Sequence, residues 1–589
     1  MPSRGKSLEA LRRLFSFPAT GAAGIAPVAG AALLAAALLL PIGDAPWFSF
    51  WREWVASAAA LLIVLGALQI LQRQGLALRL RLLSAPGLAL VLAAWCWLQF
   101  AAGLVPYLSD ALLASLYLAG FGLCWAASAA LPEPERAALA DRVAAAWLAA
   151  AMLSVPIAVG QWLGWLTLDM GLRPAGGRPV AHMEQANLLC SLLVQGAIGL
   201  WRLHVRAYLG RRLSVLGLVA LLAVIVLTQS RVAWLVGAVA TGIVVWRPQL
   251  APLRSTGKVM LASTVAVFAG AILLPGLDAT LGLEGASLAD RTSQGRRPAI
   301  WALFADAATE KPLLGWGVLQ NGAAQFALAE RHSSMGWYFS SAHNIALDLM
   351  VWFGIPLGLL AAGTLYLGAL RRLATATTSA ELATAFGATA LLLHGLVELP
   401  LQYAYFLLPL GLMLGAGTSV HAASAAPGPM AVWRHRGVPI AIAAFATGLM
   451  AMLAHEYIRI TDVRPGMAID KSIGYLVLEA DGPAPDVVLL DRLRAFHDFA
   501  AIPLGSAAPP GKLAAARTVL LRSPFAPVIE RAAVIAAVSD DPARAAEALA
   551  RVCRFETADA CEESRRVWGL WRDRWAQLPP WPEPNRALP

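Results

Sequence analysis

The chain has 589 residues, of which 58% are hydrophobic and only 14% are charged, and its formal net charge is +10. A soluble domain is about 25% charged, so this chain lacks the charge to cover a soluble core of its size, and disorder requires low hydrophobicity with high net charge. The basic residues stand in short clusters between apolar runs, which is typical of membrane proteins rather than of nucleic-acid-binding faces. The composition therefore predicts an all-α polytopic membrane protein, and it excludes a soluble cytosolic enzyme and a disordered chain.

Thirteen segments are predicted to be transmembrane helices, because each is mostly apolar over a length close to the roughly 20 residues that a bilayer requires. The first follows a basic N-terminus and is long, so we expect a true span rather than a cleaved signal peptide. The predicted spans lie near residues 22–42, 55–71, 84–104, 109–131, 139–164, 184–202, 213–229, 232–247, 259–275, 344–369, 380–399, 401–418 and 437–455.

The orientation follows from lysine and arginine, which favour the cytoplasmic side of a membrane. With the N-terminus inside, the inner segments hold 20 of these residues, and the short outer loops hold only four: Arg52, Arg173, Arg178 and Arg231. An odd number of spans then places the C-terminus outside, which indicates a bacterial inner-membrane protein. Five segments result: a cytoplasmic N-terminus (1–20), nine spans (21–277), a large periplasmic loop (278–342), four spans (343–455) and a periplasmic C-terminal region (456–589).

The C-terminal region has the periodicity of short paired helices at 527–538 and 543–554, and its proline-rich end is expected to be irregular. Cys553 and Cys561 lie in this region. An oxidising compartment permits a disulfide between them, although a pair of free thiols is also consistent with the sequence. The chain contains no CxxC motif and no Cys/His cluster at zinc-binding spacing.

Polar side chains at membrane depth are costly and are functional candidates, and here they gather on the predicted outer side. Each has a structural alternative: Arg231 as a snorkelling arginine, Arg297 as a solvated one, and a lone interface histidine as a packing residue. His394 and Glu398 are one helical turn apart and could satisfy each other. The candidates are Gln185, Asn187, Arg231, Arg297, His343, Asn344, His394, Glu398, Tyr403 and Tyr405.

Together these groups suit an anionic head group, especially a pyrophosphate. Arginine binds phosphate oxygens through bidentate, charge-assisted hydrogen bonds, and histidine is suited to proton transfer near neutral pH. The sequence has neither a GxxxxGK[ST] nor a GxGxxG motif and no DxD pair, which disfavours an ATP-driven transporter and a nucleotide-sugar enzyme. A secondary transporter stays open, although the two halves show no internal repeat.

Six motifs carry a resemblance to a known group. They are EQAN (184–187), LTQSRVAWL (227–235), GRRPAIW (295–301), KPLLGWG (311–317), AHNIALDLMVWFGIPLG (342–358) and HGLVELPLQYAYFLLPLGLMLG (394–415). Over roughly residues 180–420 the sequence resembles the bacterial O-antigen ligase and O-oligosaccharyltransferase superfamily, which includes O-antigen polymerases. The last motif and the additional C-terminal region resemble the PglL-type protein O-oligosaccharyltransferases.

This resemblance implies en bloc transfer of a glycan from undecaprenyl pyrophosphate to a Ser or Thr hydroxyl of a periplasmic protein, such as a pilin, without a metal or cofactor. His343 would be the general base, with the mid-loop His332 as a less well positioned competitor, and Arg231 and Arg297 would bind the donor pyrophosphate. Two alternatives stay open: an O-antigen ligase acting on lipid A-core, and a transporter or flippase of lipid-linked or anionic cargo. Residues implied in positioning glycan or acceptor are Gln185, Asn187, Asn344, Glu398, Tyr403 and Tyr405.

Overall fold

The computed structural model describes residues 22–582 except 44, 77, 83, 167–176, 253–254, 284–295, 418–429, 434–436, 471–474 and 481. The predicted cytoplasmic N-terminus and part of the predicted large loop therefore lie outside the described residues. The described chain is mostly helical with very little sheet, which confirms the all-α fold class. Two small antiparallel sheets complete it, β1 (Leu78–Arg81) with β2 (Met430–Trp433) and β3 (Gly466–Asp470) with β4 (Tyr475–Glu479).

Every segment predicted as a span contains a helix. One of them, 344–369, contains two, because Gly354 ends α14 and α15 starts at the next residue. The helices are α2 (Ala22–Leu39), α3 (Phe50–Arg73), α4 (Ala85–Ala101), α5 (Leu108–Ala130), α6 (Glu133–Trp162), α7 (Ala186–Val205), α8 (Arg211–Thr228), α9 (Arg231–Trp246), α10 (Thr256–Thr280), α14 (Ile345–Phe353), α15 (Ile355–Thr375), α16 (Ser379–Gly395), α17 (Ala404–Ala416) and α19 (Gly437–Thr461).

Eight helices in the described part of the chain are long and apolar enough to cross a membrane. They are α3, α5, α6, α7, α8, α10, α15 and α19. Shorter apolar helices include α4, α9 and α17. The chain is thus a multi-pass membrane protein, while thirteen crossings remain a prediction from the sequence.

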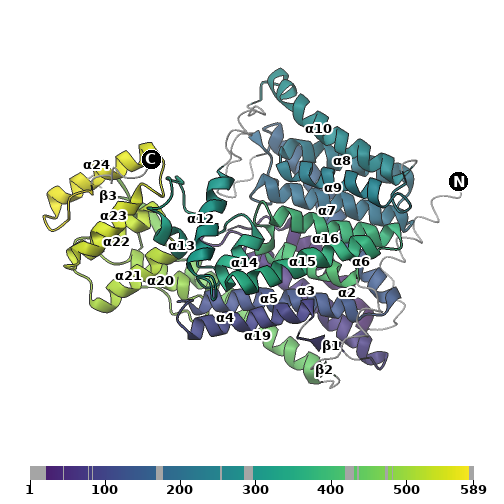
Figure 1. Ribbon diagram of the computed structural model, residues 1–589, viewed down its shortest axis with the longest axis horizontal. Helices are drawn as coiled ribbons and strands as arrows, with labels where there is room; N and C mark the ends of the chain where they lie inside the picture. Colours follow the sequence, from purple (N-terminus) through teal and green to yellow (C-terminus); the bar gives the residue numbers. More distant parts are fainter. Residues whose placement is uncertain are drawn as a thin grey trace. The chain divides into compact units, whose positions relative to one another are not determined.

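The first of two compact units comprises residues 1–93, 116–295 and 361–448. Its central helix is α7, whose apolar stretch is 78% buried and which packs against α6, α8 and α16; α8, α9 and α10 follow beside it (Figure 1). At the predicted inner end of α7, Arg202 donates to Thr384 Oγ1 at 2.8 Å and to the Ala380 carbonyl at 2.7 Å. This arginine, which is 5% exposed, is therefore a buried link between α7 and α16.

The second compact unit comprises residues 94–115, 296–360 and 449–589. Two of its helices, α12 (Arg297–Glu310) and α13 (Asn321–Leu328), come from the predicted large loop. Its C-terminal helices (Figure 1) are α20 (Asp491–Ala500), α21 (Pro510–Arg522), α22 (Ala526–Val538), α23 (Pro542–Val552) and α24 (Ala558–Arg574). The two paired helices predicted from periodicity are confirmed as α22 and α23.

The large loop and the C-terminal region share one hydrophobic core. Phe326 of α13 is 3% exposed and belongs to the same buried cluster as Ile529 of α22 and Trp568 of α24. A disulfide joins Cys553, at the end of α23, to Cys561 in α24. The sequence places these regions more than a hundred residues apart, yet they fold as one body.

Candidate functional site

Asn187 is the centre of a polar cluster in the first unit, at the N-terminal end of α7. Its Oδ1 accepts hydrogen bonds from Arg178 Nη2 at 3.0 Å and from Ser230 Oγ at 2.9 Å. Its Nδ2 donates to Glu398 Oε1 at 2.8 Å. One amide thus joins α7 to the turn between α8 and α9 and to the segment that follows α16. Since Ser230 directly precedes Arg231, this cluster also fixes where α9 begins.

His394 and Glu398 both take partners on α7. Glu398 accepts from Asn187, and His394 Nδ1, in a fully buried ring, is hydrogen-bonded to Ser191 Oγ. Asn187 and Ser191 are one turn apart on α7, so the two pairs form successive rungs between the helices. His394 lies in α16 and Glu398 three residues beyond its end at Gly395, and both residues help to attach this end of α16 to α7.

Two sequence candidates stand exposed at helix starts in this unit. Gln185 is the N-terminal capping residue of α7, and Arg231 is the first residue of α9. Both side chains are exposed. The guanidinium of Arg231 is therefore accessible to a phosphate group.

Tyr403 and Tyr405 stack on each other, with ring centroids 5.2 Å apart. Tyr405 is fully buried, and the guanidinium of Arg52 lies 5.9 Å from the centroid of its ring. Arg52, also fully buried, forms an ion pair with Glu184. The tyrosines are therefore linked through Arg52 to the residue that precedes Gln185.

A second buried carboxylate holds the start of α17. Glu53, which is 4% exposed, accepts hydrogen bonds from Ser49, from Tyr117, from Trp47 Nε1 at 2.9 Å and from the Ala404 backbone N–H at 3.2 Å. These hydrogen bonds offset the free-energy cost of burying the carboxylate. Glu53 therefore fixes the backbone between Tyr403 and Tyr405.

In the second unit, His343 sits on a strained turn immediately before α14. Its φ is +52°, in the left-handed region that side-chain-bearing residues rarely adopt. Its backbone N–H donates to Ser341 Oγ at 2.9 Å. Its half-buried ring packs edge-to-face against Phe339, with ring centroids 5.9 Å apart. Strain of this kind persists only where the surroundings hold it.

Asp348 supplies that support. It is 1% exposed and accepts from Ser341 Oγ at 2.6 Å, from the Ala342 N–H at 2.8 Å and from Asn321 Nδ2 at 2.8 Å. Both carboxylate oxygens are thereby engaged with the two residues that precede His343. The imidazole consequently projects from a backbone that a buried carboxylate holds in place.

Asn344 is the N-terminal cap of α14. Its Oδ1 accepts from the backbone N–H groups of Ala346 at 3.1 Å and Leu347 at 3.2 Å. Asparagine is among the best capping residues because it satisfies donors that have no partner within the helix. Asn344 therefore fixes the start of α14 directly after His343.

Arg297 is the first residue of α12 and is half-buried. Its neighbour Arg296 donates from Nη1 to the Met335 carbonyl at 3.3 Å. His332, which we expected to be poorly held, lies with its Nε2 3.0 Å from an Asp306 carboxylate oxygen. This partner on α12 was not evident from the sequence, and His332 remains the predicted weaker candidate for the base.

The glycines of the KPLLGWG and FGIPLG motifs permit close backbone contact. The Trp316 N–H donates to the Val351 carbonyl and the Ile355 N–H to the Pro312 carbonyl, both at 2.7 Å. Gly354 has φ +84° and ψ 161°, and a Cβ there would lie 2.3 Å from the Leu313 carbonyl oxygen. This part of the family pattern is thus explained by packing rather than by chemistry.

Sequence reasoning did not select Arg52, Arg178, Glu184 or Asp348, although each organises a candidate. Arg52 and Arg178 were two of the four basic residues in predicted outer loops, so their exceptional position was a usable signal. Asp348 is the acidic residue in an otherwise apolar run, which is a similar signal.

Two family models match parts of this chain. A family model described as O-antigen ligase matches residues 216–362, a range that includes Arg231, Arg297 and His343. A model described as the C-terminal part of a virulence factor membrane-bound polymerase matches residues 388–561. The second range extends from α16 through most of the C-terminal helices.

Two curated relatives come from Acinetobacter baylyi. A general O-oligosaccharyltransferase is 30% identical over 398 residues, which are 65% of this chain and 68% of that protein. A ComP-specific O-oligosaccharyltransferase is 33% identical over 127 residues, which are 21% of this chain and 23% of that protein. The chain belongs to the bacterial O-antigen ligase and O-oligosaccharyltransferase family of membrane glycosyltransferases.

Proposed function

We propose that this protein transfers a preassembled glycan from undecaprenyl pyrophosphate to Ser or Thr hydroxyls of periplasmic proteins, with a pilin as one such acceptor. The names of both relatives, which describe O-oligosaccharyltransferases, support transfer to protein. A lipid-linked donor agrees with a multi-pass membrane protein. An O-antigen ligase that acts on lipid A-core is the rival with the same chemistry, and a transporter or flippase is the rival of another class.

The main observation behind the proposal is that Asp348 holds the turn that bears His343 in place. A general base must be held within hydrogen-bond reach of the proton it takes, and Asp348 fixes the turn that bears this imidazole. The segment lies within the match to the O-antigen ligase model. The left-handed backbone of His343 also supports the proposal, because strained conformations of this kind cluster at active sites.

In the proposed reaction, His343 takes the proton of the acceptor hydroxyl as its oxygen bonds to the anomeric carbon of the glycan. The bond between that carbon and the pyrophosphate oxygen breaks, and both of its electrons leave with the lipid pyrophosphate. Arg231 and Arg297 bind the pyrophosphate oxygens and stabilise the charge that grows on them. The proton then passes from the imidazolium to solvent. Gln185, Asn187, Asn344, Glu398, Tyr403 and Tyr405 position the glycan or acceptor, directly or through the contacts described above.

The proposal places the protein in the bacterial inner membrane, with the N-terminus in the cytoplasm and with the reacting groups and residues 456–589 in the periplasm. The disulfide between Cys553 and Cys561 agrees with an oxidising compartment. A phosphatase fused to the C-terminus should be active, and a fluorescent protein fused there should remain dark. The opposite pair of results would reverse this topology.

His343→Ala tests the chemistry, with His332→Ala as the matched control in the same unit. Loss of a general base typically costs about 10²–10⁴-fold, so His343→Ala should abolish the mass shift of periplasmic acceptor proteins while membrane insertion stays normal. His332→Ala should keep most of the transfer. Normal glycosylation by His343→Ala would refute its role, and modified lipid A-core with unmodified proteins would favour the ligase.

The donor site has its own test. Arg231→Ala and Arg297→Ala should each reduce transfer by about ten- to a hundred-fold, since a hydrogen bond to a charged group contributes about 1.5–3 kcal/mol. Replacement by lysine should restore only part of the rate, because lysine lacks the bidentate fork. Metal independence is tested in the same assay, where transfer should survive excess EDTA.

A further inference from the structure

A buried ion pair attaches the C-terminal helices to the start of α5 within the second unit. Arg522, the last residue of α21, donates from Nε to Asp110 Oδ2 at 2.6 Å and from Nη2 to Oδ1 at 3.1 Å. Asp110 is 2% exposed and Arg522 is 7% exposed. Burial has the largest single effect on the pKa of Arg522 and lowers it, but the charge and hydrogen bonding of Asp110, together with Tyr338 and Tyr107, raise the pKa by more in sum. The pair is therefore a charged, bidentate contact shielded from solvent.

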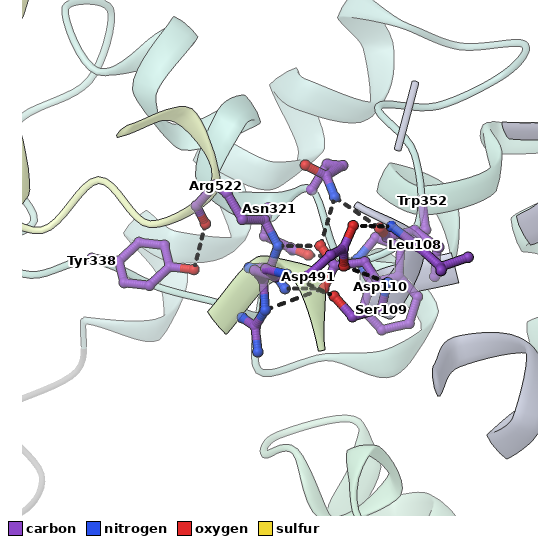
Figure 2. Close-up of polar contacts among 11 residues, drawn as sticks. Leu108, Ser109, Asp110, Asn321, Tyr338, Trp352, Asp491 and Arg522 are labelled. Atoms are coloured by element: carbon purple, nitrogen blue, oxygen red, sulfur yellow. Dashed lines mark hydrogen bonds and ion pairs between the residues drawn. The ribbon is translucent and has the colours of Figure 1, made fainter. Parts of the chain in front are cut away.

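The neighbouring helix α20 strengthens this attachment. The Asp491 carboxylate accepts from the backbone N–H groups of Leu108 and Ser109, both at 2.8 Å, and so caps α5 from another part of the chain (Figure 2). Arg492 places its Nε 3.5 Å from Asp110 Oδ1. An acidic group at a helix N-terminus is stabilising. The first turn of α5 is thus held by two C-terminal helices.

Two adjacent residues connect Asp110 to the carboxylate that supports His343. Gln320 Nε2 donates to Asp110 Oδ2 at 3.3 Å, and Asn321 Nδ2 donates to Asp348 Oδ1 at 2.8 Å. Gln320 is 3% exposed and Asn321 is fully buried. Figure 2 shows Asn321 between Arg522 and Trp352, and the Trp352 indole N–H donates to Asn321 Oδ1. The polar groups form one buried series from α21 to α14.

Every member of this series is hydrogen-bonded, and such networks are stiff because any member left unpaired is costly. A displacement of Arg522 moves Asp110, which shifts Gln320 and the start of α13. Asn321 would then lose its place against Asp348. The backbone of the His343 turn depends on that same carboxylate.

We propose that Arg522 is a positioning residue for His343, acting through Asp110, Gln320, Asn321 and Asp348, so that the C-terminal helices are part of the transfer apparatus. The inference rests on the proposed role of His343 as the base. It makes Arg522 a determinant of the rate of transfer, although the residue lies 179 positions further along the chain. The alternative is that the ion pair only holds the fold together.

A double-mutant cycle in the full-length protein separates these alternatives. Arg522→Lys, Asp348→Asn and the double variant are assayed for kcat and for the KM of the lipid-linked donor. Arg517→Lys is the matched control, because Arg517 lies on the same helix in an ion pair with Glu547 at 3.1 Å but is 40% exposed. Asp110→Asn serves as a second way to break the buried pair. Melting temperature and monodispersity verify that each variant is folded.

We expect Arg522→Lys to lower kcat about tenfold with the donor KM within about twofold, and Arg517→Lys to leave both near wild type. The double variant should lose little more than its more affected single variant, since coupled residues are non-additive. Multiplicative losses would overturn the proposal, as would an effect of Arg522→Lys no larger than the control. Misfolding of both Arg522→Lys and Asp110→Asn would assign the pair to folding and would also overturn it.

His343→Ala, assayed in parallel, distinguishes this failure from failure of the proposed function. If His343→Ala retains transfer, the base lies elsewhere and the proposed function of His343 is refuted. If His343→Ala is inactive while Arg522 and Asp348 act independently, only the positioning inference is refuted.

Discussion

Replacement of Gly354 by alanine is predicted to be among the most damaging single-methyl changes in the second unit. Gly354 ends α14 at φ +84° and ψ 161°, a region that only glycine adopts readily and that costs other residues about 1–3 kcal/mol. The added Cβ would also lie 2.3 Å from the carbonyl oxygen and 2.5 Å from the carbonyl carbon of Leu313. Overpacking of this kind costs about 1–3 kcal/mol more. The expected loss of about 2–6 kcal/mol is a large share of a typical stability of about 5–15 kcal/mol.

Gly363→Ala is the matched control, since Gly363 lies within α15 and a Cβ there meets nothing within 4 Å. An alanine in a helix interior is favoured by about 0.5–1 kcal/mol over glycine, so this variant should melt at or slightly above the wild-type temperature. Both variants are purified and unfolded by heat with tryptophan fluorescence as the signal, and transfer is assayed below the melting range. A wild-type melting temperature for Gly354→Ala would refute the argument from backbone conformation and close contact.

Three further predictions concern other parts of the structure. Asn187→Asp should impair transfer by placing a second carboxylate against Glu398, and Glu398→Gln in the same chain should restore much of it in the acceptor mass-shift assay, because an amide again donates between them. Burial of Glu530 raises its pKa to about 8, with the hydrogen bond from Ser564 opposing the shift and the charge of Glu556 adding to it. The folded state therefore retains a proton that the unfolded state releases near pH 4.5. The melting temperature of the wild type should fall between about pH 5 and pH 8, and that of Glu530→Gln should fall less. Replacing Cys553 and Cys561 with serine should cost about 2–3 kcal/mol for a loop of this length and lower the melting temperature, with the difference from wild type abolished by a reducing agent.

The helices were largely predictable from the sequence because hydropathy and periodicity are local properties. Amphipathic periodicity placed α22 and α23, and each predicted span contains a helix. The break at Gly354 was missed, since α14 and α15 are both apolar and a hydropathy window does not register where one helix ends and the next begins. The Gly-Ile-Pro sequence at this point was the available local signal.

The partners of the polar residues were not predictable in the same way. Arg52 pairs with Glu184, and Arg522 pairs with Asp110 across 412 positions of the chain. Sequence spacing identifies neighbours within one helix but carries no information about such distant contacts. The cost of burying polar groups marked Asn187 and Glu398 as functional candidates, yet the same cost is met by hydrogen bonds within the protein. A functional role and a structural role therefore both account for a residue that is buried, polar and close to a reacting group.

That ambiguity has a physical resolution in the exposure of the candidates. Arg231 and Gln185 are exposed and His343 is half-buried, so these groups remain available to a ligand. Asn187 is partly buried, and Glu398 and Asp348 are buried; their oxygens accept hydrogen bonds from this chain. Groups of the second kind fix the geometry of groups of the first kind, and a misplacement of about 1 Å can cost about a hundredfold in rate. Substitutions of the exposed groups should therefore change the contribution of one contact, whereas substitutions of the buried groups should alter several contacts at once and combine non-additively with them.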